Sequence, residues 1–376
     1  MKLFEVRRYG FSSVAAFVIS LAGCSGAQSP IASFPLPAVN DPAGALSGLS
    51  PACSGSRIGH AQCDLLIPKG GALPMYSGWS ASQLERAYHL PISRGAGQTV
   101  FIVDAYDNPR VESDFREYRS TMGLPAGKLN KFNQEGQRGN YPPANRGWGA
   151  EIDIDVDMVS ASCPKCTVDL IEADTDLWLN LELAEREAVK LGATIVSNSF
   201  SGRVGGKSYF DAKGVTYLAS AGDSGIRLID PATFASVVAV GGTELTAGGG
   251  RRGFTETIWP NSGGGCSSTG VAKPPWQLKS IYGQRCPYRH GVDLSAIAAN
   301  VEYYDTYQNI GWTVAYGTSI GTPFCAGIFA LAGNATQQTG GKTFWMAAHH
   351  PYLNRVGGVR YTSQGGFGSP NGIGAF

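Results

Sequence analysis

The sequence has 376 residues, of which 43% are hydrophobic and 16% are charged. This is enough apolar material for a packed core, in one large α/β domain or in two smaller ones. A formal net charge of +1, with no basic run longer than two residues, argues against nucleic acid as a partner.

The N-terminus has the pattern of an export signal, which we assign to residues 1–24. Lys2, Arg7 and Arg8 precede an apolar stretch, residues 11–22, that is too short to span a bilayer. We therefore expect a protein that is exported, either to the cell envelope or out of the cell.

The export segment ends in Leu21-Ala-Gly-Cys24, which resembles a bacterial lipobox. In that case Cys24 is lipidated, and this lipid is the protein's only attachment to a membrane. Ordinary cleavage near Ala27 is the alternative, because Ser25 and Ala27 supply the small residues that signal peptidases require.

Export makes the cysteine pattern informative, because exported proteins keep disulfides. The eight cysteines lie at positions 24, 53, 63, 163, 166, 266, 286 and 325. Apart from Cys24 and Cys325 they form three close pairs, 53/63, 163/166 and 266/286, which predict local disulfides. The pair 163/166 also has the spacing of a redox motif or half a zinc site, but no second such motif exists. Cys325 lies in an apolar run and is expected to be buried and free.

Residues 25–78 are rich in proline, glycine and serine, and we interpret them as a linker and a small disulfide-tied arm. From residue 79 the pattern changes to that of a folded domain, residues 79–376. Helices are predicted at residues 80–88, 109–118 and 177–191, and buried strands at 98–104, 193–199, 215–221 and 237–240.

Strands that alternate with helices predict an α/β fold with a mostly parallel central sheet and helices on both faces. Ligands on such sheets bind at the carboxyl ends of the strands. The loops that follow Asp104, Asn198 and Ala221 are therefore the expected place for chemistry.

Residues 149–161 alternate acidic and apolar residues. As a strand, they would place four carboxylates along one face. As a helix, they place Ile152 and Val156 on a core stripe, while Glu151 and Asp155 share a different face. Two carboxyl groups in one environment push their pKa values apart, so that one becomes a usable base. A solvated acidic helix face is the alternative.

The segment Ser220-Ala-Gly-Asp223-Ser-Gly225 is a glycine-flanked loop that leaves an apolar strand. Such a loop lets the backbone and one side chain approach a substrate closely. An ionised acid would repel a tetrahedral oxyanion, whereas a protonated Asp223 would donate a hydrogen bond to it.

The segment Tyr316-Gly-Thr-Ser319-Ile-Gly-Thr-Pro323 opens a buried helix that is rich in small residues. It places the Ser319 hydroxyl at a helix N-terminus, where free N–H groups suit a nucleophile and a nearby oxyanion. A plain helix-capping serine is the alternative.

A serine nucleophile needs a base, which is often a histidine. The five histidines are at positions 60, 89, 290, 349 and 350. His60 and His89 are expected to be exposed, and His290-Gly291 lacks the threonine of a His-Gly-Thr segment. A histidine-dependent subtilisin is therefore not predicted.

Four motifs in this order resemble the sedolisin (serine-carboxyl peptidase) family, over about residues 79–376. They are Glu151-x-x-x-Asp155, Ala219-Ser-Ala-Gly-Asp223-Ser-Gly, Ala239-Val-Gly-Gly-Thr243 and Gly317-Thr-Ser319-x-x-x-Pro323. The resemblance implies a subtilisin-like three-layer fold. It also implies a serine-type endopeptidase that acts on protein or peptide substrates, and we expect a monomer.

The resemblance also implies a role for each matching residue. Ser319 is the nucleophile, Glu151 is the general base, Asp155 positions Glu151, and Asp223 is the oxyanion donor. An acidic pH optimum follows, because Asp223 must hold a proton while Glu151 and Asp155 share theirs.

Two features depart from the family. The aspartate positions of its calcium site hold Arg355 and Thr362, and a cation there would repel Ca²⁺. We therefore predict no metal and no cofactor. The long propeptide of the family is also missing, so residues 25–78 are at most a remnant of it.

The competing hypothesis is a catalytically inactive, envelope-anchored binding or structural lipoprotein on the same fold. The presence of all four residues, Glu151, Asp155, Asp223 and Ser319, argues against it.

Overall fold

The computed structural model describes residues 48–53, 57–70, 77–203, 207–250, 252–278, 280, 282–307, 311–338 and 340–376. Cys24 and the rest of the export segment lie outside the described residues, so export and lipidation stay predictions. None of the helices within these ranges combines the length and apolar character that a membrane span requires.

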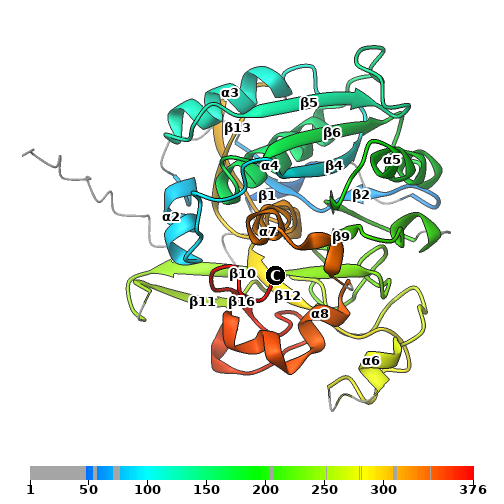
Figure 1. Cartoon of the computed structure of the whole chain (residues 1–376), viewed down its shortest axis with the longest axis vertical. Coiled ribbons are helices and arrows are strands. Elements are labelled where there is room, and N and C mark those ends of the chain that lie inside the picture. The colour runs from blue at the N-terminus through cyan, green and yellow to red at the C-terminus, as the bar shows by residue number, and fades with distance from the viewer. Residues whose placement is uncertain are drawn as a thin grey trace, which may run out of the picture. The chain divides into compact units, whose positions relative to one another are not determined.

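A mostly parallel sheet forms the centre of the molecule (Figure 1). Its strands lie in the order β11–β10–β9–β7–β4–β6–β5, and β12 also pairs with β10. Only the β10–β11 pair is antiparallel within the described part of this sheet. The strands are β4 (Thr99–Ala105), β5 (Lys128–Asn133), β6 (Thr167–Ala173), β7 (Ile195–Asn198), β9 (Thr216–Ser220), β10 (Val237–Ala247), β11 (Phe254–Ile258) and β12 (Leu294–Ile297).

Helices cover both faces of the sheet. They are α2 (Ala81–Ala87), α3 (Val111–Thr121), α4 (Arg146–Ser162), α5 (Trp178–Lys190), α6 (Pro275–Leu278), α7 (Thr318–Ala332) and α8 (Lys342–Trp345). Short 3-10 turns are η1 (Lys207–Phe210), η2 (Ala335–Gln337), η3 (Ala347–Tyr352) and η4 (Val356–Gly358). Helices α4 and α7 pack against each other and the sheet, while α5 packs against β4 and β6.

The strand register places α5 on the face opposite to α4. Asp104 interacts with Asp155 of α4, and Ile102, two residues earlier on the same face of β4, pairs with Ser197 of β7. Asn198, the next residue of β7, points the other way and interacts with Glu185 of α5. The predicted arrangement of three layers is therefore confirmed.

The predicted secondary structure of the central domain agrees with the observed elements. The helices expected at 80–88, 109–118, 149–161 and 177–191 are α2, α3, α4 and α5, and the four expected strands are β4, β7, β9 and β10. Helix α2 begins with the capping box formed by Ser80 and Gln83. Strands β5, β6, β11 and β12 were not predicted, because their polar residues interrupt the apolar pattern.

Helix α4 differs from its prediction in one respect. We expected one apolar stripe, with the acids on another face, but every residue from Gly147 to Ser162 is buried. Its neighbours α2, α3, α7 and β13 (Val301–Asp305) surround it. The solvated acidic face is therefore excluded, and Glu151, Asp153, Asp155 and Asp157 are each at most 1% exposed.

Glycine lets α4 and α7 approach each other closely. A Cβ on Gly327 of α7 would lie 2.0 Å from the Oγ atom of Ser162 in α4. Every residue of α7 from Thr318 to Leu331 is buried, which matches its run of small and apolar side chains. The helix that begins at the predicted nucleophile is thus held against the helix that carries the predicted acids.

The N-terminal arm is more ordered than the sequence indicated. Strand β1 (Leu49–Pro51) pairs with β3 (Leu66–Pro68), and β2 (Gln62–Cys63) pairs with β8 (Phe200–Ser201), all antiparallel. Two further antiparallel pairs join β13 to β14 (Gly311–Ala315) and β15 (Leu353–Asn354) to β16 (Ser369–Pro370). The arm therefore pairs with the central domain through β2 and β8.

The three predicted disulfides are confirmed: Cys53–Cys63, Cys163–Cys166 and Cys266–Cys286. Cys325 is a buried free cysteine, also as predicted.

The close contact at Gly327 predicts how much the free energy of unfolding falls when one methyl group is added between α4 and α7. Gly327→Ala should lower the free energy of unfolding by about 1–3 kcal/mol, because the new Cβ overlaps the Ser162 hydroxyl. The double variant Gly327→Ala/Ser162→Ala should recover part of this loss, because the overlapping oxygen is removed. Chemical denaturation of both variants and of Ser162→Ala checks this; strictly additive losses would contradict it.

Candidate active site

Ser319 lies in the first turn of α7, as the sequence predicted. Gly317 precedes the helix with a φ of 142°, and Ser319 is fully buried. The Ser319 hydroxyl donates to the carbonyl oxygen of Ser199 at 3.3 Å. Pro323 has no N–H to offer the carbonyl of Ser319 four residues earlier, and Ser199 Oγ donates to that carbonyl at 3.4 Å instead.

Glu151 and Asp155 share the face of α4 that is turned toward Ser319. Burial raises the pKa of Glu151, and the nearby Ser319 hydroxyl offsets part of this rise, although neither carboxyl oxygen of Glu151 has a completed hydrogen bond. A hydroxyl rotates freely, so Ser319 can turn its proton from Ser199 toward Glu151. Asp155 Oδ1 accepts from Ser199 Oγ at 2.8 Å. Glu151 is fully buried, so it does not point into solvent.

Asp104, near the end of β4, lies close to Glu151 and Asp155. The sequence did not predict that Asp104 belongs to the site. Burial and the neighbouring Asp155 and Glu172 raise the pKa of Asp104. Burial, followed by Asp155 and Asp104, raises the pKa of Glu151 in the same way. Burial also raises the pKa of Asp155, while its hydrogen bond from Ser199 lowers it. The three carboxyl groups therefore hold protons at pH values where exposed acids are ionised.

A signal for Asp104 was present in the sequence. It ends an apolar strand, at the edge of the sheet where ligands were expected. Only its contact with α4 shows that it belongs to the cluster with Glu151 and Asp155.

Asp223 lies beside the N-terminus of α7. Its Oδ1 atom accepts hydrogen bonds from the backbone N–H and the hydroxyl of Thr318, both at 2.9 Å. Its Oδ2 atom is buried and has no hydrogen-bond partner within the described part of the chain. Burial and the nearby Asp64 raise the pKa of Asp223, which favours a protonated carboxyl group.

Asp64 was not predicted to lie here, because nothing in the sequence of the arm marks it. It is 5% exposed, and it interacts with both Glu151 and Asp223. The site therefore contains four buried carboxyl groups, those of Asp64, Asp104, Glu151 and Asp155, and the partly buried Asp223. No basic residue is among the groups that shift the pKa of Glu151, Asp155 or Asp223.

The five histidines have their partners elsewhere. His60 contacts Asp176, His89 contacts Asn371, and His290 contacts Tyr361. His349 and His350 contact the carbonyls of Ala375 and Phe344. His60 is partly buried, so its predicted exposure was wrong, while His89 is exposed. No described histidine contact involves Ser319.

The C-terminal positions of the family calcium site carry no carboxylate. Arg355 is exposed, and Thr362 Oγ1 accepts from the backbone N–H of Gly365 at 2.8 Å. The predicted loss of that site stays a prediction.

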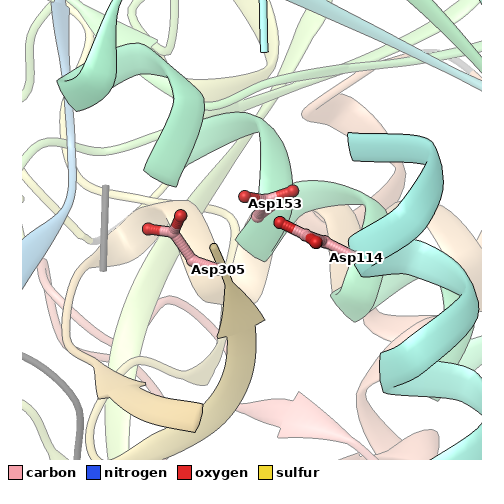
Figure 2. Close-up of side chains that lie close together, drawn as sticks. All are labelled: Asp114, Asp153 and Asp305. Atoms are coloured by element: carbon pink, nitrogen blue, oxygen red, sulfur yellow. The ribbon is translucent and has the colours of Figure 1, made fainter. Parts of the chain in front are cut away.

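A second acidic cluster lies on the other side of α4. Asp114 of α3, Asp153 of α4 and Asp305 of β13 place carboxyl oxygens within 4.8 Å of one another (Figure 2). Asp114 accepts from the backbone N–H and hydroxyl of Thr306, whereas neither oxygen of Asp153 has a completed hydrogen bond. Three hard oxygen donors at this spacing can hold a cation or share protons. Burial, then Asp305 and Asp114, raise the pKa of Asp153.

The model of the subtilase family matches residues 163–354 of this chain, just over half of it. Kumamolisin of Bacillus sp. (strain MN-32) is 28% identical in an alignment of 228 residues that covers 52% of this chain and 40% of kumamolisin. The chain therefore spans well under half of kumamolisin's length.

Among solved structures, Pseudomonas sedolisin, a serine-carboxyl proteinase complexed with two molecules of pseudo-iodotyrostatin, superposes with a TM-score of 0.66. It is 21% identical, over 78% of this chain and 95% of sedolisin. Fervidolysin from Fervidobacterium pennivorans, related to subtilisin, superposes with a TM-score of 0.53 at 14% identity, over 82% of this chain and 46% of fervidolysin. These similarities confirm the subtilisin-like fold and the resemblance to the sedolisins.

The cluster in Figure 2 predicts a pH-dependent effect of Asp153→Asn. The raised pKa of Asp153 means that its protonated form stabilises the fold in acid, and this contribution is lost as the pH rises through the folded-state pKa. The asparagine keeps the neutral form, so the variant should melt above the wild type at neutral pH and close to it at about pH 4.

Melting temperatures across this range check the prediction, with the exposed Asp174→Asn as the control. If calcium raised the melting temperature of the wild type but not of Asp153→Asn, the cluster would be holding a cation and the proton-sharing interpretation would be wrong.

Proposed function

Because this chain belongs to the subtilase family of peptidases, we propose that it is a serine-type endopeptidase that hydrolyses protein or peptide substrates in acid. Ser319 is the nucleophile, Glu151 is the general base that accepts its proton, Asp155 positions Glu151, and Asp223 stabilises the oxyanion. The observation that carries this proposal is that Glu151 is fully buried and near enough to Ser319 for the serine hydroxyl to affect its pKa. The protein acts outside the cytoplasm, consistent with its disulfides.

The reaction begins when the Ser319 hydroxyl turns from the Ser199 carbonyl toward Glu151. Glu151, Asp155 and Asp104 are packed together without a neutralising cation among their described neighbours, so they carry less than one charge each. An ionised Glu151 takes the proton as Ser319 Oγ attacks the substrate carbonyl. It then returns the proton to the leaving amine, and water later releases the acyl group.

Two hydrogen-bond donors at the start of α7 stabilise the oxyanion. One is the backbone N–H of Ser319, which points out of the first helical turn. The other is the protonated Oδ2 of Asp223, whose Oδ1 is fixed by Thr318. A donor that is already oriented stabilises the developing charge without reorganisation.

The proposed roles of Ser319 and Glu151 predict a strong loss of activity in two variants. Ser319→Ala should lower kcat by roughly 10⁶-fold, and Glu151→Gln by about 10²–10⁴-fold, because the attacking oxygen and its proton acceptor are removed. Hydrolysis of casein and of a quenched peptide from about pH 3 to about pH 8 checks this. Full activity of Glu151→Gln at neutral pH would contradict the carboxylate mechanism but leave a serine peptidase.

The proposed role of Asp223 predicts how kcat/KM changes on the alkaline side of its pH profile. Its raised pKa keeps it protonated in acid, and the donor is lost as the pH rises through that pKa, so kcat/KM should fall. Asp223→Asn keeps an N–H donor at every pH and should retain activity further into the alkaline range. Asp223→Ala should lose about 10²–10³-fold in kcat at all pH values. Identical profiles for wild type and Asp223→Asn would contradict this role.

A further inference from the structure

Asp223 lies in a loop, residues 221–225, whose own sequence does not fix its shape. Gly222 and Gly225, on either side of it, have φ angles of 88° and 82°, in the left-handed region that glycine adopts without strain. Glycine also loses more conformational freedom on folding than any other residue. The position of the Asp223 carboxyl group therefore depends on contacts that this segment, the Asp223 loop, makes with other parts of the chain.

A second loop, residues 261–265, provides two of these contacts, and we call it the Gly263 loop. The N–H of Gly263 donates to the Gly222 carbonyl at 2.6 Å, and the N–H of Gly225 donates to the Asn261 carbonyl at 2.9 Å. These two hydrogen bonds run in opposite directions between the loops. The Gly263 loop therefore holds the residues on both sides of the aspartate.

Gln364 joins the two loops from the C-terminal part of the chain. Its side-chain nitrogen, Nε2, donates to the Gly225 carbonyl at 2.6 Å and to the Ser262 carbonyl at 2.9 Å. A primary amide carries two N–H groups on one nitrogen, so both hydrogen bonds form at once. One side chain therefore ties the Asp223 loop to the Gly263 loop.

Ser262 binds Gln364 in return. Its Oγ donates to the backbone carbonyl of Gln364 at 3.0 Å, and it accepts from the backbone N–H of Gly242 at 2.8 Å. Ser262 is fully buried. Each of the two residues thus donates from its side chain to the other's backbone carbonyl, and β10, which contains Gly242, connects the pair to the central sheet.

A tight turn presents Gln364 to the two loops. Thr362 and Gly366 exchange both of their backbone hydrogen bonds, at 3.2 and 2.9 Å. The N–H of Val292, two residues before β12, donates to the Ser363 carbonyl at 3.0 Å. The backbone around Gln364 is therefore fixed independently of the two loops, so that its amide group can position them.

The Asp223 loop is held at its other end by the start of α7. Thr318 binds Oδ1 of Asp223, and its hydroxyl also accepts from the N–H of Gly222 at 3.2 Å. Oδ2 lies beside Gly317, since a Cβ there would be 3.0 Å from it. With Thr318 at one end of the loop and Gln364 at the other, Oδ2 is kept at the N-terminus of the helix.

We propose that Gln364 is a positioning residue for the reaction, which holds Asp223 where its carboxyl group donates to the oxyanion. The inference rests on the proposed function, and it adds a residue that none of the four sequence motifs contains. Gln364 acts through Gly225 and does not touch the substrate in this role. A donor that is held in place stabilises the transition state more than the bound substrate, so we expect the loss of Gln364 to change kcat rather than KM.

The first test replaces the amide with a side chain of similar length that has no N–H group. Gln364→Met should lower kcat by about 10–10²-fold and leave KM within about twofold, because a small displacement of the oxyanion donor is costly. Hydrolysis of the quenched peptide at about pH 4 measures both constants. A change confined to KM would contradict the proposed role.

The matched control is Gln137→Met. Gln137 is exposed, and it lies in the loop after β5, at the opposite edge of the sheet from β10 and β11. This variant should have the kcat and KM of the wild type. If it lost as much activity as Gln364→Met, the loss would not be specific to Gln364 and the proposal would be wrong.

A double variant distinguishes the positioning of Asp223 from a general loss of structure. In Asp223→Ala no carboxyl group is left to position, so adding Gln364→Met should lower kcat by less than about threefold further. All rates are referred to the folded fraction of each sample, measured by circular dichroism. Losses that multiply in full would mean that Gln364 acts independently of Asp223, which would overturn the proposal.

Gln364→Glu adds a pH-dependent readout. A protonated glutamate keeps one donor for the two carbonyls, whereas the ionised form has none. The ratio of its kcat to that of the wild type should therefore be highest at about pH 3 and fall at least about tenfold by about pH 6, above the ordinary pKa of glutamate. A ratio that is constant across this range would rule out the amide as a donor.

Ser319→Ala separates this inference from the proposed function. If the wild type hydrolyses the peptide, Ser319→Ala does not, and Gln364→Met has the kcat of the wild type, then the role of Gln364 is overturned and the peptidase stands. If no hydrolysis by the wild type depends on Ser319, both proposals are overturned.

Discussion

The burial of an acidic helix is the constraint on which the rest of the structure depends. Helix α4 carries four acids that alternate with apolar residues, and none of the four is more than 1% exposed. Burying a carboxylate without a cation is so costly that the group keeps its proton instead. Glu151 and Asp155 face α7 and Asp104, while Asp153 and Asp157 face α3 and β13. These buried acids therefore keep their protons to higher pH values than exposed acids do.

Ser319, the proposed nucleophile, is positioned by backbone features that cooperate with this helix. Gly327 brings α7 against α4, and Pro323 frees the carbonyl of Ser319 for Ser199. Ser199 also bonds Asp155, and its carbonyl receives the Ser319 hydroxyl. Ser199, directly after β7, therefore links Ser319 to the acids of α4, an arrangement that fits the proposed activation of this serine without a histidine.

The N-terminal arm lies against this site. Its strand β2 pairs with β8, and the carbonyl oxygen of Asp64 accepts a hydrogen bond from the backbone N–H of Ser319. The Cys53–Cys63 disulfide ties this strand to the rest of the arm.

The sequence by itself determined what depends on neighbours along the chain. The spacing of Glu151 and Asp155 by four residues, the Gly-Thr-Ser start of α7, the close cysteine pairs and the apolar strands β4, β7 and β9 are all local patterns. Only the tertiary structure decided what depends on contacts between distant residues. The burial of α4 from Gly147 to Ser162 requires α3, α7 and β13 around it. Asp104 of β4 lies near Asp155 of α4, and Asp64 contacts Ser319 from the position directly after β2, a strand of two residues that is too short for any periodic signal. Periodicity reports which face of one element is apolar, but it cannot report which other element covers the polar face.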